Sequence, residues 1–184
     1  MVQEEHEIDR YTIAIADDDE LCLVFLRKML EEYGYNVVTA ENGKEIIEKA
    51  IKIPPDLFLL DITMSDMDGF ETCKVLKSIE DLEAIPVIFV SSLSEPFSKL
   101  KGFELGAVDY IDKPFTIEEA VSRVRTHLSL SSKIKELEKM NAAMINREMR
   151  VIELKKEVNS LSEKLNTNPP YDVVWSDDTT LDNG

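Results

Sequence analysis

The chain has 184 residues, of which 43% are hydrophobic and 32% are charged, so it can bury a core and is not expected to be globally disordered. Its formal net charge of −16 repels phosphate backbones and anionic lipids, which excludes general nucleic-acid binding and membrane-surface binding from the expected functions. No apolar run approaches the ~18 residues of a membrane span, and the N-terminus lacks an apolar signal segment, so we expect a cytoplasmic protein.

The charge is distributed unevenly over three segments. Residues 1–129 have a net charge of −14, residues 130–165 have +2, and residues 166–184 carry four aspartates and no basic residue. Different charge balances favour different kinds of structure. The sequence predicts a leader at 1–9, an α/β domain at 10–128, a coiled-coil helix at 129–166 that continues the domain's last helix, and an acidic tail at 167–184.

The α/β domain begins with two repeats of a strand followed by a helix. YTIAIA (11–16) is a β-branched apolar run that predicts a buried strand. Helical spacing of apolar residues then starts at Glu20 and stops at Gly34. A second strand is expected over 36–40, followed by a second helix that ends before Pro54.

The same pattern repeats three more times. Strands are expected over 56–61, 86–92 and 107–112, with helices over 70–79 and 97–105 and a fifth helix opening at Thr116. Thr116 followed by Glu119 is a capping-box pattern, which marks a helix N-terminus. Five strand–helix units in about 125 residues predict an α/β fold with a doubly wound, five-stranded parallel sheet.

Chemically active side chains lie at the ends of four of the five predicted strands. They are Asp17, Asp18 and Asp19 at the end of the first strand, Asp61 at the end of the third, Ser91 and Ser92 at the end of the fourth, and Lys113 at the end of the fifth. Ligands of open parallel sheets bind at this edge. Clustered carboxylates need a cation, and oxygen ligands suit Mg²⁺. A lysine and a hydroxyl suit a phosphoryl group, and a carboxylate can accept one. A single aspartate after a strand is usually a turn or cap residue, but the joint set predicts phosphoryl chemistry.

Four sequence stretches carry a resemblance to a known family. They are IAIADDDE (13–20), LFLLDITMSDMDGF (57–70), VIFVSSLSE (87–95) and GAVDYIDKPF (106–115). Over residues 10–128 the chain resembles the receiver domain of bacterial two-component response regulators. The resemblance implies a flavodoxin-like sheet with strand order 2-1-3-4-5. It also implies that Asp61 accepts a phosphoryl group from a sensor histidine kinase or a phosphotransfer protein.

The resemblance also implies a metal site and its ligands. Asp18 would bind Mg²⁺ directly, Asp17 largely through water, and Asp61 and the backbone carbonyl of Thr63 would complete the protein ligands. Asp19 is expected at a helix N-terminus rather than in the metal site. Mg²⁺ is therefore the expected cofactor.

The same resemblance assigns the phosphoryl-binding and switch residues. Lys113 would pair with the phosphoryl oxygens, and Ser91 would hydrogen-bond to the phosphoryl group. Tyr110 matches the family's switch aromatic, which turns inward when the hydroxyl of Ser91 moves. The expected protein is a phosphoacceptor rather than an enzyme, limited to phosphorylation from small phosphodonors and slow autodephosphorylation.

The chain departs from the family pattern at a few positions. Ser65 stands where a proline is common, which predicts a less stiff loop. Neither Thr63 nor Leu93, at positions linked to dephosphorylation rate in the family, can orient an attacking water, so we expect a long-lived phosphoryl group.

A phosphatase of the haloacid-dehalogenase type is an alternative interpretation of the first acidic cluster. There Asp17 would be the nucleophile and Asp19 a general acid, with a lysine downstream. Leu21 stands where a hydroxyl residue is expected, and no cap domain is evident. Such an enzyme would turn over through Asp17, whereas a receiver is labelled once, at Asp61.

Apolar residues repeat every seven positions along the second segment. The a positions are Leu130, Leu137, Met144, Val151, Val158 and Leu165, and the d positions are Lys133, Met140, Arg147, Leu154 and Leu161. This repeat predicts a left-handed coiled coil and a parallel homodimer through residues 130–165. A single helix folding back on its own domain is the structural alternative, and a constitutive scaffold that does not depend on phosphorylation is the functional one. The stretch 146–161 also resembles helical connectors of hybrid kinases.

The acidic tail carries no core pattern. Pro169 and Pro170 end the helix, and disorder or loose docking is the default expectation beyond them. Tyr171, Val173, Val174 and Trp175 form a small apolar cluster. This cluster would either dock on a partner or begin a further domain.

Overall fold

The computed structural model describes residues 11–92 and 96–171. The leader, Leu93 and the last thirteen residues lie outside the described part, so the predictions made for them stay predictions. The chain divides into two compact units, Met1–Lys133 and Ile134–Gly184. Its elements are β1 Thr12–Ala16, α1 Glu20–Glu32, β2 Asn36–Ala40, α2 Gly43–Lys52, β3 Leu57–Leu60, α3 Gly69–Leu76, β4 Val87–Ser91, α4 Pro96–Glu104, β5 Asp109–Asp112 and α5 Ile117–Lys164.

The five strands form one parallel sheet with the order β2-β1-β3-β4-β5. Ile13 of β1 is in register with Val37 of β2 and with Leu57 of β3. The backbone N–H of Asp61 donates to the carbonyl of Ala16 at 2.8 Å, so the pairing of β3 with β1 continues one residue beyond β3. The predicted fold class and strand order are confirmed.

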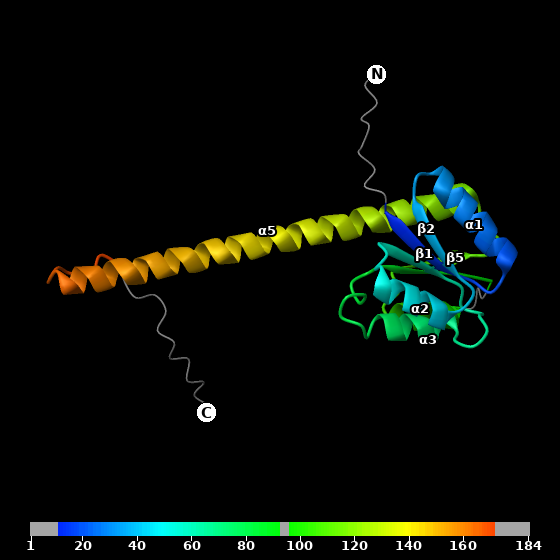
Figure 1. Ribbon diagram of the computed structural model, residues 1–184, viewed down its shortest axis with the longest axis horizontal. Coiled ribbons are helices and arrows are strands. Elements are labelled where there is room, and N and C mark those ends of the chain that lie inside the picture. The colour runs from blue at the N-terminus through cyan, green and yellow to red at the C-terminus, as the bar shows by residue number, and fades with distance from the viewer. Residues whose placement is uncertain (1–10, 93–95, 172–184) are drawn as a thin grey trace, which may run out of the picture. The chain divides into compact units, whose positions relative to one another are not determined.

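Helices cover both faces of the sheet (Figure 1). Side chains alternate along each strand, so Ile13 packs with α1 and α5, whereas Ala14 packs with α2 and α3. The two cores contain, for example, Leu26 and Val124 on one face and Phe70 on the other. Burial of both sheet faces accounts for the apolar residues at nearly every position of β1, β3 and β4.

Two predicted helix ends differ from the structure. Helix α3 ends at Leu76 rather than at residue 79, because the ammonium of Lys77 donates to the carbonyls of Glu83 and Ile85 at 2.6 and 2.7 Å and holds a turn there. Helix α5 ends at Lys164, five residues before Pro169.

A backbone motif, and not the proline pair, ends α5. Asn166 has a φ of 55°, a left-handed conformation that asparagine tolerates, and the N–H of Thr167 donates to the carbonyl of Ser162 at 2.9 Å. This is the arrangement that commonly closes helices. In the described parts of the chain, no helix combines the length and the apolar character that a membrane crossing requires.

The part of α5 in the second unit exposes its apolar heptad positions. Exposed fractions range from 40% for Val158 to 59% for Met144, and every apolar a and d position of this part, from Leu137 to Leu161, is exposed. An exposed apolar stripe of this length is unusual without a partner.

Truncation of a core leucine gives the first testable prediction. Leu59 is fully buried in β3, whereas Leu21 is 80% exposed on α1. Leu59→Ala is expected to lower the free energy of unfolding by about 2–5 kcal/mol, because it removes buried methyl groups and leaves a cavity. Leu21→Ala is the matched control and should change stability by no more than about 0.5 kcal/mol. Urea denaturation followed by circular dichroism measures both, and equal effects would contradict the core assignment.

Candidate functional site

The acidic residues predicted to cluster lie together at the carboxyl ends of β1 and β3. One carboxylate oxygen from each of Asp17, Asp18 and Asp61 can be chosen so that the three atoms lie within 4.8 Å of one another. Asp17 and Asp61 are 1% and 5% exposed, whereas Asp18 is exposed. Two buried carboxylates side by side repel each other unless a positive charge lies between them.

Lys113 supplies that positive charge. Its Nζ lies 2.6 Å from Oδ2 of Asp17 and 2.8 Å from Oδ2 of Asp61. The chain reaches this position because the N–H of Lys113 donates to the carbonyl of Ser91 at 2.9 Å, next to a cis Lys113–Pro114 peptide bond. Burial lowers the pKa of Lys113, but the hydrogen bonds and charges of Asp17 and Asp61 outweigh it and raise the pKa overall. The ammonium is therefore charged throughout the physiological range.

Backbone N–H groups orient the other carboxylate oxygens. Oδ1 of Asp17 accepts from the N–H of Asp19 at 2.9 Å, and Oδ1 of Asp61 accepts from the N–H of Thr63 at 3.2 Å. Oδ2 of Asp18 accepts from the N–H of Ser65 at 3.2 Å, which ties the first strand's loop to the third strand's loop. The structure therefore places Thr63 beside Asp61, and the role of its carbonyl as a ligand stays a prediction.

Asp19 has a different role from Asp17 and Asp18, the two aspartates that precede it. Its side chain accepts from the N–H of Leu21 at 2.9 Å and forms the N-cap of α1. A side chain engaged in this way satisfies a donor of the helix's first turn. The expectation that Asp19 belongs to the helix terminus is confirmed.

The predicted switch pair lies next to this cluster. Ser91 is fully buried at the end of β4, and Tyr110 of β5 is 6% exposed. Burial raises the pKa of Tyr110, and a side-chain hydrogen bond with Ser91 opposes that shift. The phenol ring also packs 6.0 Å from the ring of Phe89, and the ammonium of Lys99 lies 5.2 Å from its centre. Ser91 and Tyr110 are therefore coupled directly, whereas Ser92 is exposed.

Two neighbours of the site were not predicted from the sequence. A Cβ atom at Gly69 would lie 2.2 Å from the carbonyl oxygen of Asp61, so only glycine lets the start of α3 approach Asp61 this closely. The Asp68-Gly69 pair is a turn signal that could have indicated it. Cys22 is half-buried beside Asp17; burial first, and then its hydrogen bond to Asp17, raise the pKa of the thiol to about 12.

The donor set fits a hard divalent cation. All of the clustered ligand atoms are carboxylate oxygens, and one of the three carboxylates is exposed, so solvent can supply further ligands. Mg²⁺ prefers oxygen ligands and keeps several of its waters, whereas zinc sites usually include sulfur or imidazole. The arrangement can therefore hold Mg²⁺ beside a carboxylate that is itself held by a lysine.

Comparisons with known proteins match this part of the chain. A sequence profile described as the response regulator receiver domain matches residues 13–125. The alkaline phosphatase synthesis transcriptional regulatory protein PhoP of Bacillus subtilis is 39% identical over 119 residues, which are 65% of this chain and 49% of that protein. The transcriptional regulatory protein CreB of Escherichia coli is 37% identical over 121 residues, which are 66% of this chain and 52% of CreB. The chain spans about half the length of these curated relatives.

Solved structures agree with the sequence relatives. A two-component response regulator from Clostridium difficile superposes with a TM-score of 0.61 and 30% identity, covering 65% of this chain and 96% of that one. A CheY-like receiver domain protein from Methanospirillum hungatei gives a TM-score of 0.64 at 26% identity, covering 67% and 97%. Both matches cover nearly all of the solved chain and about two thirds of this one.

Proposed function

This chain belongs to the response regulator receiver domain family, and from that membership we propose that it is a cytoplasmic phosphoacceptor in which Asp61 takes a phosphoryl group from a phosphohistidine. The donor would be a sensor histidine kinase or a phosphotransfer protein. The observation that carries the proposal is the pairing of Lys113 with Asp61 and Asp17, at the edge of the sheet where Ser91 also ends its strand.

The proposed transfer requires little covalent chemistry from the protein. A carboxylate oxygen of Asp61 forms a bond to phosphorus while the bond between phosphorus and the donor imidazole nitrogen breaks, and the imidazole keeps the electron pair. Asp17, Asp18, Asp61 and the carbonyl of Thr63 would hold a magnesium ion, which would supply positive charge for the phosphoryl oxygens. Positioning and electrostatic stabilisation supply most of the catalysis in reactions of this type.

The chain's own residues then respond to the new charge. Lys113 gains phosphoryl oxygens as partners in addition to its two carboxylates. The hydroxyl of Ser91, which now hydrogen-bonds with Tyr110, gains a stronger, charged acceptor at Asp61. A change of partner at Ser91 alters the surroundings of the Tyr110 ring, so the face formed by β4 and β5 would differ between the two states.

Phosphoryl uptake from acetyl phosphate tests the proposed function. The full chain is incubated with acetyl phosphate, with Mg²⁺ or with a chelator, and its intact mass is measured. One added phosphoryl group that requires Mg²⁺ is the expected result. Absence of uptake in Mg²⁺, or equal uptake in the chelator, would contradict the proposal.

Replacement of Asp18, the exposed carboxylate of the cluster, gives a separate prediction for the metal site. Asp18→Asn is expected to weaken Mg²⁺ binding at least ~10-fold, because it removes one negative ligand from a cation site built on carboxylates. Asp81→Asn removes the same charge at an exposed position outside the cluster and should leave binding unchanged. Calorimetric titration with Mg²⁺ measures both, and equal weakening in the two variants would show that net charge alone accounts for binding.

We also propose that residues 130–165 pair with a second copy of the chain as a parallel coiled coil. The support is that every apolar a and d position from Leu130 to Leu161 is exposed on one helix. Valine at two a positions with leucine at the neighbouring d positions favours two strands. The same stripe also supports a second candidate function, a constitutive dimeric scaffold in which phosphorylation does not alter the pairing of the two helices.

A further inference from the structure

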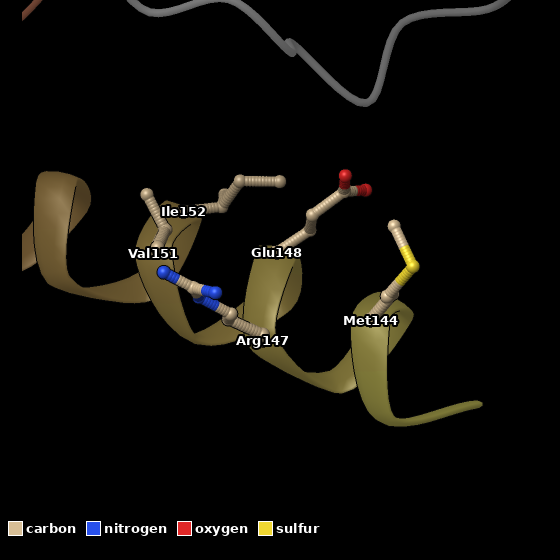
Figure 2. Close-up of a pocket in the computed structure, with 5 residues that line it drawn as sticks. All are labelled: Met144, Arg147, Glu148, Val151 and Ile152. Carbon is tan, nitrogen blue, oxygen red and sulfur yellow. The ribbon is translucent and has the colours of Figure 1, made fainter. Parts of the chain in front are cut away.

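A charged layer interrupts the apolar seam of α5 within the second unit. Arg147 occupies a d position, and Met144 and Val151 are the a positions before and after it. Both of these apolar residues are exposed. Glu148 follows Arg147 at the adjoining e position, and Figure 2 shows these four side chains on neighbouring turns of the helix. The seam therefore places one base and one acid between two apolar layers.

Neither charge has a partner on its own helix. Ion pairs within a helix form between residues three or four apart, as between Arg150 and Glu153, whose Nη1 and Oε2 atoms lie 3.0 Å apart. The residues at these distances from Arg147 include no acid, and those at these distances from Glu148 are all apolar. Among the ion pairs of residues 11–92 and 96–171, none includes Arg147 or Glu148. Both charges are therefore available to another helix.

A parallel pair of helices in register would bring these two charges together across the seam. A d side chain inserts into a hole formed by four residues of the facing helix, which are the d residue at the same level, the e residue after it and the a residues on either side. For Arg147 this hole is made by the partner's Met144, Arg147, Glu148 and Val151. The same four positions, with Ile152, line the hollow drawn in Figure 2. Each Arg147 would thus reach the partner's Glu148, and two-fold symmetry repeats the contact.

Arginine suits such a layer. Its aliphatic stem can lie against Met144 and Val151 while its planar guanidinium binds a carboxylate through two N–H groups. Two arginines and two glutamates also make a layer with no net charge. In parallel coiled coils an e residue usually pairs with the preceding g residue of the facing helix, and the g position that faces Glu148 is Ala143. No other base across the seam therefore competes for Glu148.

The other charges of this stretch form no second layer of this kind. Residues 144–158 carry four basic and three acidic residues, so the stretch as a whole is close to neutral. Arg150 at g would face the partner's Lys155 at e, a like-charge contact that Glu153 weakens by pairing with Arg150 on its own helix. Glu157, at the next g position, would face an uncharged serine. Specific attraction across the seam therefore comes from the charged d layer.

A slip of one heptad would remove this attraction. The hole that receives Arg147 would then contain Asn141 or Lys155 in place of Glu148. An unpaired guanidinium between apolar layers is costly, and a polar residue in the seam is a device that fixes register. We propose that Arg147 and Glu148 form reciprocal ion pairs between two copies of the chain, and that this layer sets the register of the coiled coil. The inference rests on the dimer proposed above and not on phosphoryl transfer.

Exchange of the two charges tests the proposal. Sedimentation over a range of concentrations measures the dimer affinity of the wild type, Arg147→Glu, Glu148→Arg and the variant that carries both changes. Each single variant places four like charges in one layer, so its dimer affinity should fall at least ~10-fold. The double variant restores an acid–base pair on each side of the seam and should recover most of the lost affinity.

Glu163→Arg is the matched control. It makes the same change of charge as Glu148→Arg, but at an exposed f position outside the seam, and should leave the dimer affinity unchanged. Circular dichroism checks that every variant keeps its helix. Wild-type affinity in Glu148→Arg, or no recovery in the double variant, would overturn the proposal and leave the dimer itself in place. A wild type that is monomeric at every concentration would overturn the layer and the dimer together.

Discussion

Asp61→Asn is expected to abolish phosphoryl uptake, so that the one phosphoryl group added by acetyl phosphate to the wild type falls to none. An amide is a much weaker nucleophile than a carboxylate, and it also removes one of the three charges that hold the cation. Asp61 is 5% exposed, and its side chain is held by Lys113 and by the N–H of Thr63. Intact mass after incubation with acetyl phosphate and Mg²⁺ measures the difference.

Two further variants make this prediction specific. Asp81→Asn, at an exposed position away from the site, should take up the phosphoryl group like the wild type. Asp17→Asn distinguishes the phosphatase alternative, because that enzyme would turn over repeatedly and depend on Asp17 rather than on Asp61. Continuous release of phosphate that survives Asp61→Asn and is lost in Asp17→Asn would contradict the receiver interpretation.

Val158→Asp is expected to convert a dimeric chain into a monomer. Val158 is an a position in the most regular part of the heptad repeat and is 40% exposed on the isolated helix. In a parallel pair the two aspartates would face each other in an apolar layer, and burying such charges costs several kcal/mol, so dimer affinity should fall at least ~100-fold. Sedimentation velocity over a range of concentrations measures the dissociation.

The control for this prediction introduces the same charge elsewhere on the helix. Met149→Asp lies outside the a and d positions and should remain dimeric. A wild type that is monomeric at every concentration, or a dimer that tolerates Val158→Asp, would show that the stripe does not pair two copies. If the wild-type dimer has the same affinity with and without acetyl phosphate, the constitutive scaffold is the better description.

The sequence was sufficient to predict the sheet because each strand is a short apolar run flanked by helical spacing. Alternation of this kind allows few topologies, and parallel strands carry their functional residues to one edge. Asp17, Asp61 and Lys113 come from distant parts of the sequence, yet each directly follows its strand, so the fold alone brings them into contact. Their contact could therefore be expected before any distance was known.

Details that depend on side chains from other elements could not be predicted. Helix α3 ends early because Lys77 reaches two carbonyls of the following turn, and periodicity carries no information about such a contact. Gly69 matters because the backbone of Asp61 passes beside it. The raised pKa of Cys22 comes first from burial and then from its hydrogen bond to Asp17 at the end of β1. Helix α5 ends at Lys164 because Asn166 takes a left-handed conformation. Residue propensities give the proline pair that follows as the stronger helix-ending signal, so the sequence indicated the prolines instead.

Chemical trapping of the phosphorylated residue tests the central claim most directly, because it identifies the acceptor without a mutation. The chain is phosphorylated with acetyl phosphate and Mg²⁺ and then treated with borohydride, which reduces an aspartyl phosphate to homoserine, and peptide masses locate the change. The account predicts homoserine at position 61 and at no other aspartate. Homoserine at position 17, or a stable phosphoester at Ser91, would contradict it.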